Sequence, residues 1–271
     1  MVTLLLPRLA ARTERRFVRA SAVTARNLTA ARHFGYWWIL VSGFFEPVLY
    51  LLSIGLGVGA LVNGFTLPNG RTISYAAFVA PAMLAASAMN GALAESTMNL
   101  FGKMKYMRLY DGVLATPVQP LEVALGELMW ALIRGSIYSI AFLGLMVGMG
   151  LTSIGWALVA FPATMLIGVA FGGLGMAVAT YLRSWQDFDY LVVVQFALFL
   201  FSGTFAPADS YAPAMRIVVE LTPLYHGVEL VRGPTTGVVG WGLLGHAGYL
   251  AGLACLGLLV AGRRMAILLY R

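Results

Sequence analysis

Long runs of apolar residues, separated by short polar segments, constrain this chain more than any other feature. The runs cover residues 36–62, 73–100, 121–150, 154–182, 190–205 and 241–261. About 20 apolar residues in a helix are enough to cross the hydrocarbon core of a bilayer. Charged residues make up 11% of the chain, whereas soluble domains contain roughly 25%. The sequence therefore predicts an all-α polytopic membrane protein with six transmembrane helices.

The positions of the basic residues predict how these spans are oriented. If both termini face the cytoplasm, then of the 18 lysine and arginine residues all but Arg71, Arg134, Arg216 and Arg232 lie on the cytoplasmic side. Such an excess follows the positive-inside rule. It also accounts for the net charge of +7 without nucleic acid as a partner. We expect a multi-pass protein of the cell (cytoplasmic) membrane with both termini in the cytoplasm.

The segment before the first apolar run is rich in arginine and contains a single acidic residue, Glu14. Most of its arginines fall on one face of a helix, and Leu9, Phe17 and Val18 supply apolar area elsewhere. This pattern predicts an amphipathic helix on the anionic cytoplasmic leaflet. An arginine-rich transit peptide looks similar, but this segment leads directly into a span. We therefore divide the chain into a cytoplasmic helix over 1–35 and a transmembrane domain over 36–271.

Residues 101–117, FGKMKYMRLYDGVLATP, form a short amphipathic segment between the second and third spans. Read as a helix, it places Met104, Met107 and Tyr110 in one stripe. Its polar residues are Lys103, Lys105, Arg108 and Asp111. The segment is too short and too charged to cross a bilayer, and the charge distribution places it in the cytoplasm. Residue types alone leave two interpretations open, a solvated interfacial helix or a docking element for a soluble partner.

Four charged residues fall inside the predicted spans: Glu46, Glu95, Glu127 and Arg134. Each intramembrane charge costs about 2.5–3.5 kcal/mol on insertion scales, so each should find a partner or face water. Glu46 precedes Pro47, which we expect to kink the first span. Glu127 and Arg134 are seven residues apart and so share a helix face. These residues either line a transport route or form structural ion pairs, and the sequence does not choose between the two.

The segment between the fifth and sixth spans, residues 206–234, contains four prolines but is too apolar for a solvated loop. It predicts two short helices with a break at Pro223, dipping part-way into the outer leaflet. Such helices could form a simple lid or an outer gate through which a substrate leaves. The residues that we assign to a gate are Pro207, Pro223, His226 and Glu229.

Motifs of catalysis and cofactor binding were sought and are absent from the sequence. Neither lysine is followed by Ser or Thr, so the chain has no phosphate-binding P-loop, and it has no G-x-S-x-G motif. Asp187 and Asp189 fit an ordinary charged turn better than a metal site. The single cysteine, Cys255, excludes an internal disulfide. We expect a passive membrane subunit that is not an enzyme, with no catalytic residue, no metal and no cofactor of its own.

Six short blocks, in order, resemble a known family. They are 46–52 (EPVLYLL), 78–82 (FVAPA), 104–117 (MKY and YDGVLATP), 126–131 (GELMWA), 201–205 (FSGTF) and 223–230 (PLYHGVEL). In this order they resemble the permease subunit of type-2 ABC exporters, and most of all the nodulation lipo-oligosaccharide exporter permeases. Pro81 is followed by Ala82, where that group usually has a Pro-Gly pair. The residues before Tyr36 carry no diagnostic motif.

The resemblance implies an architecture and partners. Residues 1–35 would be the connecting helix, 101–116 the coupling helix, and 206–232 the paired re-entrant outer helices. The coupling residues would be Met104, Lys105, Tyr106, Arg108, Tyr110 and Asp111. Two permease chains would assemble with two ABC ATPase subunits, which bind ATP and Mg. The complex would export an amphiphile such as a lipo-oligosaccharide, a glycolipid, a polysaccharide precursor or a drug.

If the resemblance is set aside, the residues also fit two other functions. A stand-alone secondary transporter would show ion-coupled flux with no ATPase present. A membrane-embedded transferase that acts on lipid-linked sugars would turn over a substrate when purified.

Overall fold

The computed structural model describes residues 5–33, 45, 48–53, 57–60, 64–66, 70 and 72–269. Over this part of the chain the structure is mostly helical, with one very short hairpin, which agrees with the all-α membrane class. Most of the predicted first span, 36–62, lies outside the described residues, as does Glu46. The described part of the chain therefore consists of residues 5–33, a few short stretches between 45 and 70, and all residues from 72 to 269.

The described elements fall into three groups. The longer helices are α1 (Leu5–His33), α3 (Tyr75–Ala94), α5 (Pro120–Gly148), α6 (Ile154–Ala179), α7 (Asp187–Leu200) and α10 (Gly242–Leu269). The shorter ones are η3 (Val58–Ala60), η4 (Glu95–Asn99), η5 (Gly102–Tyr106), α4 (Leu109–Leu114), η6 (Ala208–Ser210), α8 (Pro213–Leu221) and α9 (Pro223–Thr236). The strands β1 (Phe65–Thr66) and β2 (Thr72–Ile73) pair antiparallel, with Phe65 opposite Ile73.

Four of the described helices are long and apolar enough to cross a membrane: Tyr75–Tyr106, which is α3 with its continuation, then α5, α6 and α10. They overlap four of the six predicted spans. The predicted fifth span, 190–205, differs from the structure because α7 ends at Leu200 and the chain then turns. With 14 residues, α7 is about 21 Å long, which is short of the roughly 30 Å hydrocarbon core.

Local capping explains where several helices begin. Ser74 and Ser153 precede α3 and α6, and each side chain accepts a hydrogen bond from the backbone N–H three residues later. At α5, Gln119 and Glu122 form a capping box and Pro120 occupies the first turn. These contacts satisfy backbone donors that a helix start would otherwise leave unpaired. The third and fourth spans therefore begin where the sequence predicts.

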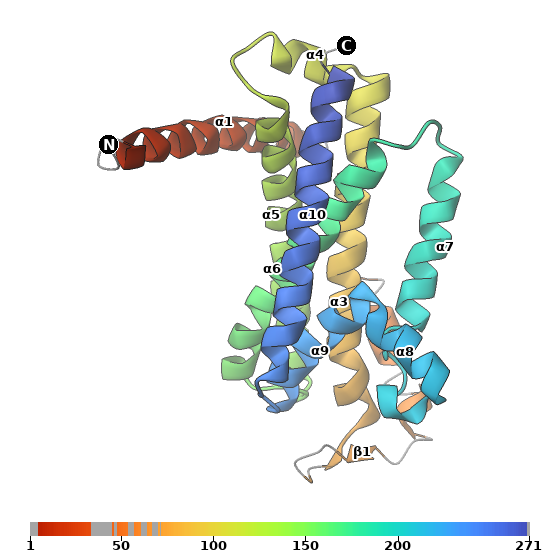
Figure 1. Cartoon of the computed structure of the whole chain (residues 1–271). Coiled ribbons are helices and arrows are strands. Elements are labelled where there is room, and N and C mark those ends of the chain that lie inside the picture. The colour runs from red at the N-terminus through yellow and green to blue at the C-terminus, as the bar shows by residue number, and fades with distance from the viewer. Residues whose placement is uncertain are drawn as a thin grey trace.

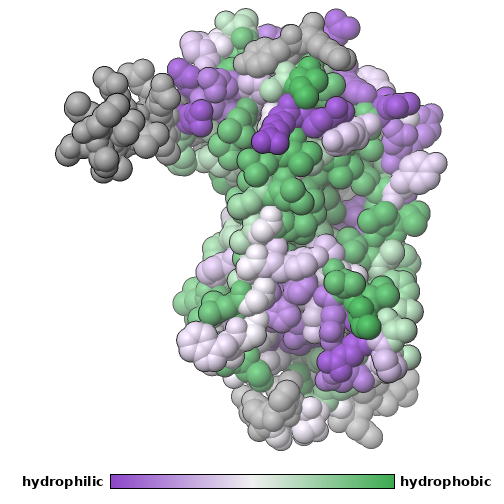
Figure 2. Space-filling model, viewed as in Figure 1, coloured by the Kyte–Doolittle hydropathy of each residue, from purple (hydrophilic) through white to green (hydrophobic). Residues whose placement is uncertain are grey.

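Figure 1 shows α3, α5, α6 and α10 running side by side as a bundle, with α1 projecting sideways from it. The C-terminal end and α4 lie at one end of the bundle, while α8 and the strand β1 lie at the other. Figure 2 shows hydrophilic residues gathered at the α4 end, above a hydrophobic zone. The helix α9 packs against α3, α6 and α10. The amphipathic segment and the proline-rich segment therefore occupy opposite ends of the molecule.

Many of the buried side chains in the described part of the chain belong to two clusters. The larger cluster joins α3, α6 and α9 and includes Phe78, Met89, Phe171 and Val228. The smaller one lies near α4, with Leu100, Tyr110, Leu128, Met176 and Met265. Because the second cluster includes a residue of α4, this short helix is packed onto the bundle and is not a free loop.

The helices α10 and α6 cross in close backbone contact at two glycines, Gly257 and Gly173. A Cβ atom at Gly257 would lie 2.5 Å from the carbonyl carbon of Gly173. No side chain fits there, so glycine allows the two backbones to approach directly. Gly252, on the same helix, has no heavy atom within 4 Å of its Cβ position.

We predict that Gly257→Ala destabilises the bundle by about 1–3 kcal/mol, because the added methyl group overpacks a backbone contact. The unfolding temperature of the detergent-solubilised protein should fall. Gly252→Ala is the matched control and should leave that temperature unchanged or slightly higher, since alanine is the better helix former. Equal effects from the two variants would contradict the assigned crossing.

Candidate functional site

The predicted amphipathic helix over residues 101–117 is two helical pieces in the structure. The long helix that begins as α3 continues through the π-helical segments η4 and η5 to Tyr106. Arg108 then adopts a left-handed conformation, with φ 46° and ψ 34°, and α4 follows. This conformation is uncommon outside glycine and often marks functional positions. The prediction of a single continuous helix is wrong, because the left-handed turn at Arg108 interrupts it.

The residues assigned to coupling divide into two groups by exposure. Lys105, Tyr106, Arg108 and Asp111 are exposed, while Met104 and Tyr110 are buried. Met107 was expected to share a stripe with Met104 and Tyr110, but 72% of its surface is exposed, because the turn at Arg108 reorients the chain. We call residues 101–114 the docking element, after one of the two interpretations of the sequence. The segment presents charged and aromatic side chains outward, while Met104 and Tyr110 hold it to the bundle.

The carboxylate of Glu127 is the main attachment point of the docking element. It is buried on α5, and four side chains donate hydrogen bonds to it. Lys103 Nζ lies 2.6 Å from Oε2 and Tyr110 Oη lies 3.0 Å from Oε1. From α1, Asn27 Nδ2 donates to Oε2 at 2.9 Å and Arg26 Nη2 donates to Oε1 at 3.1 Å. One carboxylate therefore joins α1, η5, α4 and α5.

The contact between α1 and α5 supports this arrangement. Thr24 Oγ1 donates to the carbonyl of Gly126 at 2.9 Å. A Cβ atom at Gly126 would lie 2.5 Å from the carbonyl oxygen of Ala20, so only glycine permits the approach. One turn earlier, Arg19 pairs with Glu122 at 3.6 Å. The predicted N-terminal helix thus exists, and its C-terminal half is fixed to the third predicted span.

The charges around Glu127 are well matched to its burial. A buried carboxylate is stable only when hydrogen bonds and opposite charges replace water. Burial and the neighbouring Glu127 carboxylate raise the pKa of Tyr110 well above its usual value. The Tyr110 hydroxyl therefore stays protonated and keeps donating to Glu127. The sequence left open whether Glu127 lines a transport route or forms a structural ion pair. In the structure it forms ion pairs with Lys103 and Arg26.

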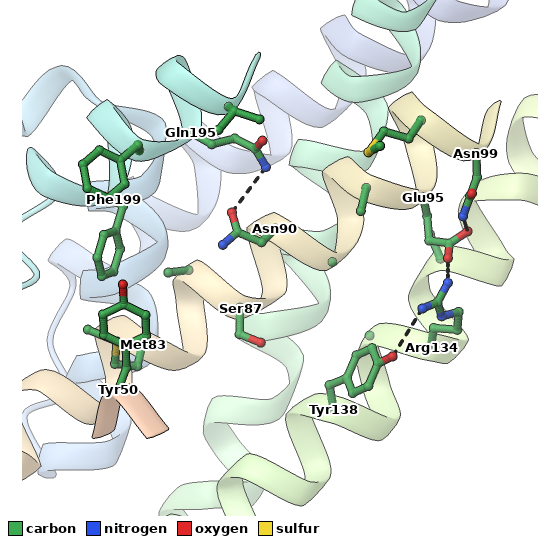
Figure 3. Close-up of a pocket in the computed structure, with 18 residues that line it drawn as sticks. Tyr50, Met83, Ser87, Asn90, Glu95, Asn99, Arg134, Tyr138, Gln195 and Phe199 are labelled. Carbon is green, nitrogen blue, oxygen red and sulfur yellow. Dashed lines mark hydrogen bonds and ion pairs between the residues drawn. The ribbon is translucent and has the colours of Figure 1, made fainter. Parts of the chain in front are cut away.

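A second polar site lies between α3, α5 and α7, in a cavity of about 670 Å³ (Figure 3). Arg134 of α5 forms an ion pair with Glu95, at the start of the π segment η4. Arg134 also donates to Tyr138 Oη at 3.3 Å, and Asn99 donates to Glu95 at 2.8 Å. Glu95 and Arg134 were predicted to need partners, and they pair with each other. Glu127 and Arg134, although on one helix face, belong to separate sites.

The rest of the cavity wall combines neutral polar groups with aromatic rings. Across the cavity, Gln195 Nε2 of α7 donates to Asn90 Oδ1 of α3 at 3.3 Å. Phe199 and Tyr50 lie at one end of the cavity, with their ring centroids 6.3 Å apart (Figure 3). Because the Glu95–Arg134 charges cancel, the cavity offers hydrogen bonds and aromatic surface without net charge. Such a surface suits a ligand that is partly polar and partly apolar.

At the opposite end of the molecule, the proline-rich segment forms α8 and α9, with the break at Thr222–Pro223. Pro223 is the first residue of α9, and Thr222 caps this helix, while Pro207 precedes the short η6. Pro223 thus begins a helix, as the fixed φ of proline favours, whereas Pro207 lies just before one. The second helix extends to Thr236, past the expected end near Arg232.

Glu229 of α9 belongs to a buried network around Arg232. Arg232 Nη1 donates to Glu229 Oε1 at 2.6 Å, and Nη2 donates to the carbonyl of Gly203 at 2.8 Å. Its guanidinium also lies over the ring of Phe78, 3.9 Å from the centroid. Arg232 therefore ties α9 to α3 and to the turn after α7. The charge distribution along the sequence placed Arg232 outside the membrane, and only its position among apolar residues pointed to this role.

His226, the last of the predicted gate residues, pairs with a histidine of α10. Its Nδ1 lies 2.8 Å from Nδ1 of His246, and its ring stacks on Tyr249 at 3.9 Å. Tyr249 Oη in turn donates to the carbonyl of Leu221, at the end of α8. The histidines looked scattered in the sequence, yet two of them meet here and join α8, α9 and α10.

The partners of Glu127 were the main omission from the sequence-based candidates. Arg26, Asn27 and Lys103 lie in polar segments with no apolar spacing of their own, so the sequence does not single them out. One signal could have found them: a buried acid on α5 needs cations, and the nearest basic residues lie in the two flanking segments. In the part of the chain that the structure describes, no three His, Cys, Asp or Glu side chains come together as metal ligands.

Among the described residues, four apolar helices long enough to cross a bilayer, with a polar cavity beside them, define a polytopic membrane protein. Residues 20–234 match the ABC-2 type transporter family, and the chain belongs to this family. The matched range begins within α1, crosses the docking element and the cavity, and ends in α9. It therefore includes Glu127 with its four hydrogen-bond donors, the residues that line the cavity, and the network around Arg232.

Among similar proteins are several named nodulation protein J. The chain is 33% identical to that of Rhizobium leguminosarum bv. viciae over 192 residues, which cover 69% of this chain and 71% of the relative. The protein of Rhizobium meliloti is 31% identical over 191 residues, covering 69% and 70%. That of Bradyrhizobium diazoefficiens is 29% identical over 213 residues, covering 78% and 79%. The resemblance stated from the motif blocks is thereby confirmed.

We predict that Glu127→Gln loosens α1 and the docking element together, because it leaves Lys103 and Arg26 without a counter-charge. Removing one member of a buried ion pair costs about 3 kcal/mol or more. The measurements are thermal unfolding in detergent and the rate of trypsin cleavage after Arg26. Glu220→Gln on the exposed helix α8 is the control. Unchanged cleavage after Arg26 would show that α1 does not depend on this carboxylate.

The histidine pair predicts a pH dependence of stability. Burial, and then the neighbouring His246, lower the pKa of His226, which lies outside the helices long enough to span a membrane. Between the lowered and the ordinary pKa the unfolded chain binds more protons, so stability rises with pH and is lost as the pH falls below about 6.5. The unfolding temperature should drop from pH 7.5 to about pH 5. The drop should be smaller in His226→Gln, and equal drops would contradict the assignment.

Proposed function

We propose that this chain is the permease subunit of an ATP-binding cassette exporter in the cell membrane. It has six spans, and both of its termini lie in the cytoplasm. The observation that carries the proposal is the docking element. It is exposed, basic and aromatic on its outer surface, and the buried Glu127 fixes it to the bundle. In a member of the ABC-2 type transporter family, such an element suits contact with an energy-supplying partner.

The partner is an ABC ATPase subunit that holds ATP and Mg, because this chain carries no P-loop. Lys105, Tyr106, Arg108 and Asp111 would contact a groove of that subunit, and Met104 and Tyr110 would pass its motion to the bundle. Two ATPase subunits and a second permease chain complete the complex. The helix α1 would act as the connecting helix on the lipid surface, since Phe17 and Val18 remain exposed beside Arg16.

The cargo is an amphiphile, moved outward along a route that includes the cavity between α3, α5 and α7. This cavity is support for the proposal because it offers amide, hydroxyl and aromatic groups around a neutralised ion pair. The candidates are a lipo-oligosaccharide, a glycolipid, a polysaccharide precursor or a hydrophobic drug. The helices α8 and α9, with Pro207, Pro223, His226 and Glu229, would form the outer gate as a re-entrant pair.

The test is the double charge reversal Arg108→Glu with Asp111→Arg, in a complex with the ATPase encoded nearest to this gene. Both side chains are exposed, so the fold should survive, while the docking contacts change sign. We expect transport in proteoliposomes to fall at least about tenfold, which corresponds to about 1.4 kcal/mol of lost coupling. ATP hydrolysis should no longer respond to the permease.

Arg216→Glu, an exposed reversal on α8, is the control and should leave coupling intact. Normal transport and assembly in the Arg108 and Asp111 double variant would refute the docking assignment. Flux driven by an ion gradient with no ATPase present would favour a secondary transporter instead.

A further inference from the structure

An aromatic cluster joins the docking element to the start of α7. Phe101 and Tyr106 come from the docking element, Trp185 from the turn before α7, and Phe188 from the first turn of α7. The centroid of Phe101 lies 5.3 Å from those of Trp185 and Phe188, with the rings edge to face. Tyr106 stacks on Trp185 at 5.5 Å. Edge-to-face and stacked rings are favourable geometries with a defined orientation.

Polar contacts hold the same turn to the docking element. Lys105 Nζ donates to the carbonyl of Leu182 at 2.7 Å and lies over the ring of Phe101, 5.1 Å from its centroid. Within the turn, Asp187 accepts hydrogen bonds from the backbone N–H groups of Arg183 and Ser184 at 2.6 and 3.1 Å. The turn is therefore rigid in itself and attached to the docking element by both a charge and aromatic surface.

Among the described residues, the helix α7 has few other attachments. Phe188 is its one buried residue, and all residues of α7 are described. Tyr190, Val192 and Val193 are between 61% and 76% exposed. Further along, α7 is held by the Gln195–Asn90 hydrogen bond and by the contacts of Phe199 with Tyr50 and Phe205. The first turn, which holds the one buried residue of α7, is therefore one of the two places where the helix is attached to the described part of the molecule.

This same helix forms one wall of the cavity. Gln195, Phe196 and Phe199 face the Glu95–Arg134 pair from across the cavity, as Figure 3 shows for Gln195 and Phe199. A small rotation of the turn before α7 would carry these side chains toward or away from α3. Packed aromatic contacts transmit such shifts because they change between discrete arrangements.

We propose that the aromatic cluster couples the docking element to α7, so that Trp185 and Phe188 are positioning residues that set the α7 wall of the cavity. The proposal rests on the proposed function, in which the ATPase moves the docking element. It adds a route separate from Glu127: the carboxylate connects the docking element to α1 and α5, and the aromatic cluster connects it to α7. Neither Trp185 nor Phe188 needs to touch the cargo.

The experiment measures the distance between α7 and α3 through disulfide formation. Asn90→Cys and Gln195→Cys are combined with Cys255→Ser, which removes the native cysteine. The rate of oxidative cross-linking is compared in the full permease–ATPase complex without nucleotide and with ATP plus vanadate. We expect the two rates to differ at least about fivefold, the lower end of usual coupling between sites. In Trp185→Ala and in Phe188→Ala the rates should become equal within about twofold, with ATP hydrolysis retained.

Two further variants separate positioning from folding. Trp185→Phe keeps an aromatic ring and should restore the nucleotide response. Trp241→Ala, at a tryptophan that is 88% exposed near the start of α10, should leave the response intact. A nucleotide response that survives Trp185→Ala and Phe188→Ala overturns the proposal. Equal cross-linking rates without nucleotide and with ATP plus vanadate, in a transporting complex with the unaltered cluster, would also overturn this proposal. That result would leave the proposed function standing. If the permease binds no ATPase and responds to none, both this proposal and the proposed function are overturned.

Discussion

The buried carboxylate of Glu127 is the interaction on which the rest of the structure depends. An acid two turns inside a membrane helix is unfavourable unless it is neutralised, and its partners here come from three other segments of the chain. The need to satisfy this one group therefore fixes α1, η5 and α4 relative to α5. Because Lys103 and Tyr110 approach from both pieces of the docking element, the left-handed turn at Arg108 between them is held in place as well. A surface that could receive a partner is thus fixed by a contact inside the bundle.

The other buried charges are also neutralised by partners, but their surroundings differ. Glu95 and Arg134 neutralise each other beside a cavity, where the pair remains next to open polar space. Arg232 is enclosed by Glu229, a carbonyl and an aromatic face, and serves as a structural connection for α9. A buried ion pair is weak evidence for stability in itself, but it strongly specifies which segments meet. The three sites lie near the docking element, at the cavity and at the far end of the bundle, so they fix the arrangement along its whole length.

Much of the fold was predictable, and the failures have identifiable causes. Long apolar runs gave four of the spans, since hydrocarbon excludes every alternative to a helix of sufficient length. The fifth run was extended too far, because Phe201 and Phe205 prolong the apolar pattern past Leu200, although Ser202, Gly203 and Thr204 between them lie in a turn. The docking element was expected to be one helix, because its residues favour helix and nothing at Arg108 announces a left-handed turn. Glu95, Glu127 and Arg134 were recognised as needing partners, but the partners themselves were not identified.

The sequence by itself determined the class of protein, four helical spans of the bundle and the family, because these follow from local composition and short motifs. Only the tertiary structure decided which charges meet. Arg26 and Glu127 are about a hundred positions apart, as are Asn90 and Gln195, and pairing over such distances depends on how helices pack, which local residue preferences do not encode. The same holds for the aromatic cluster, whose members look like ordinary interfacial residues until α7 is placed beside the docking element.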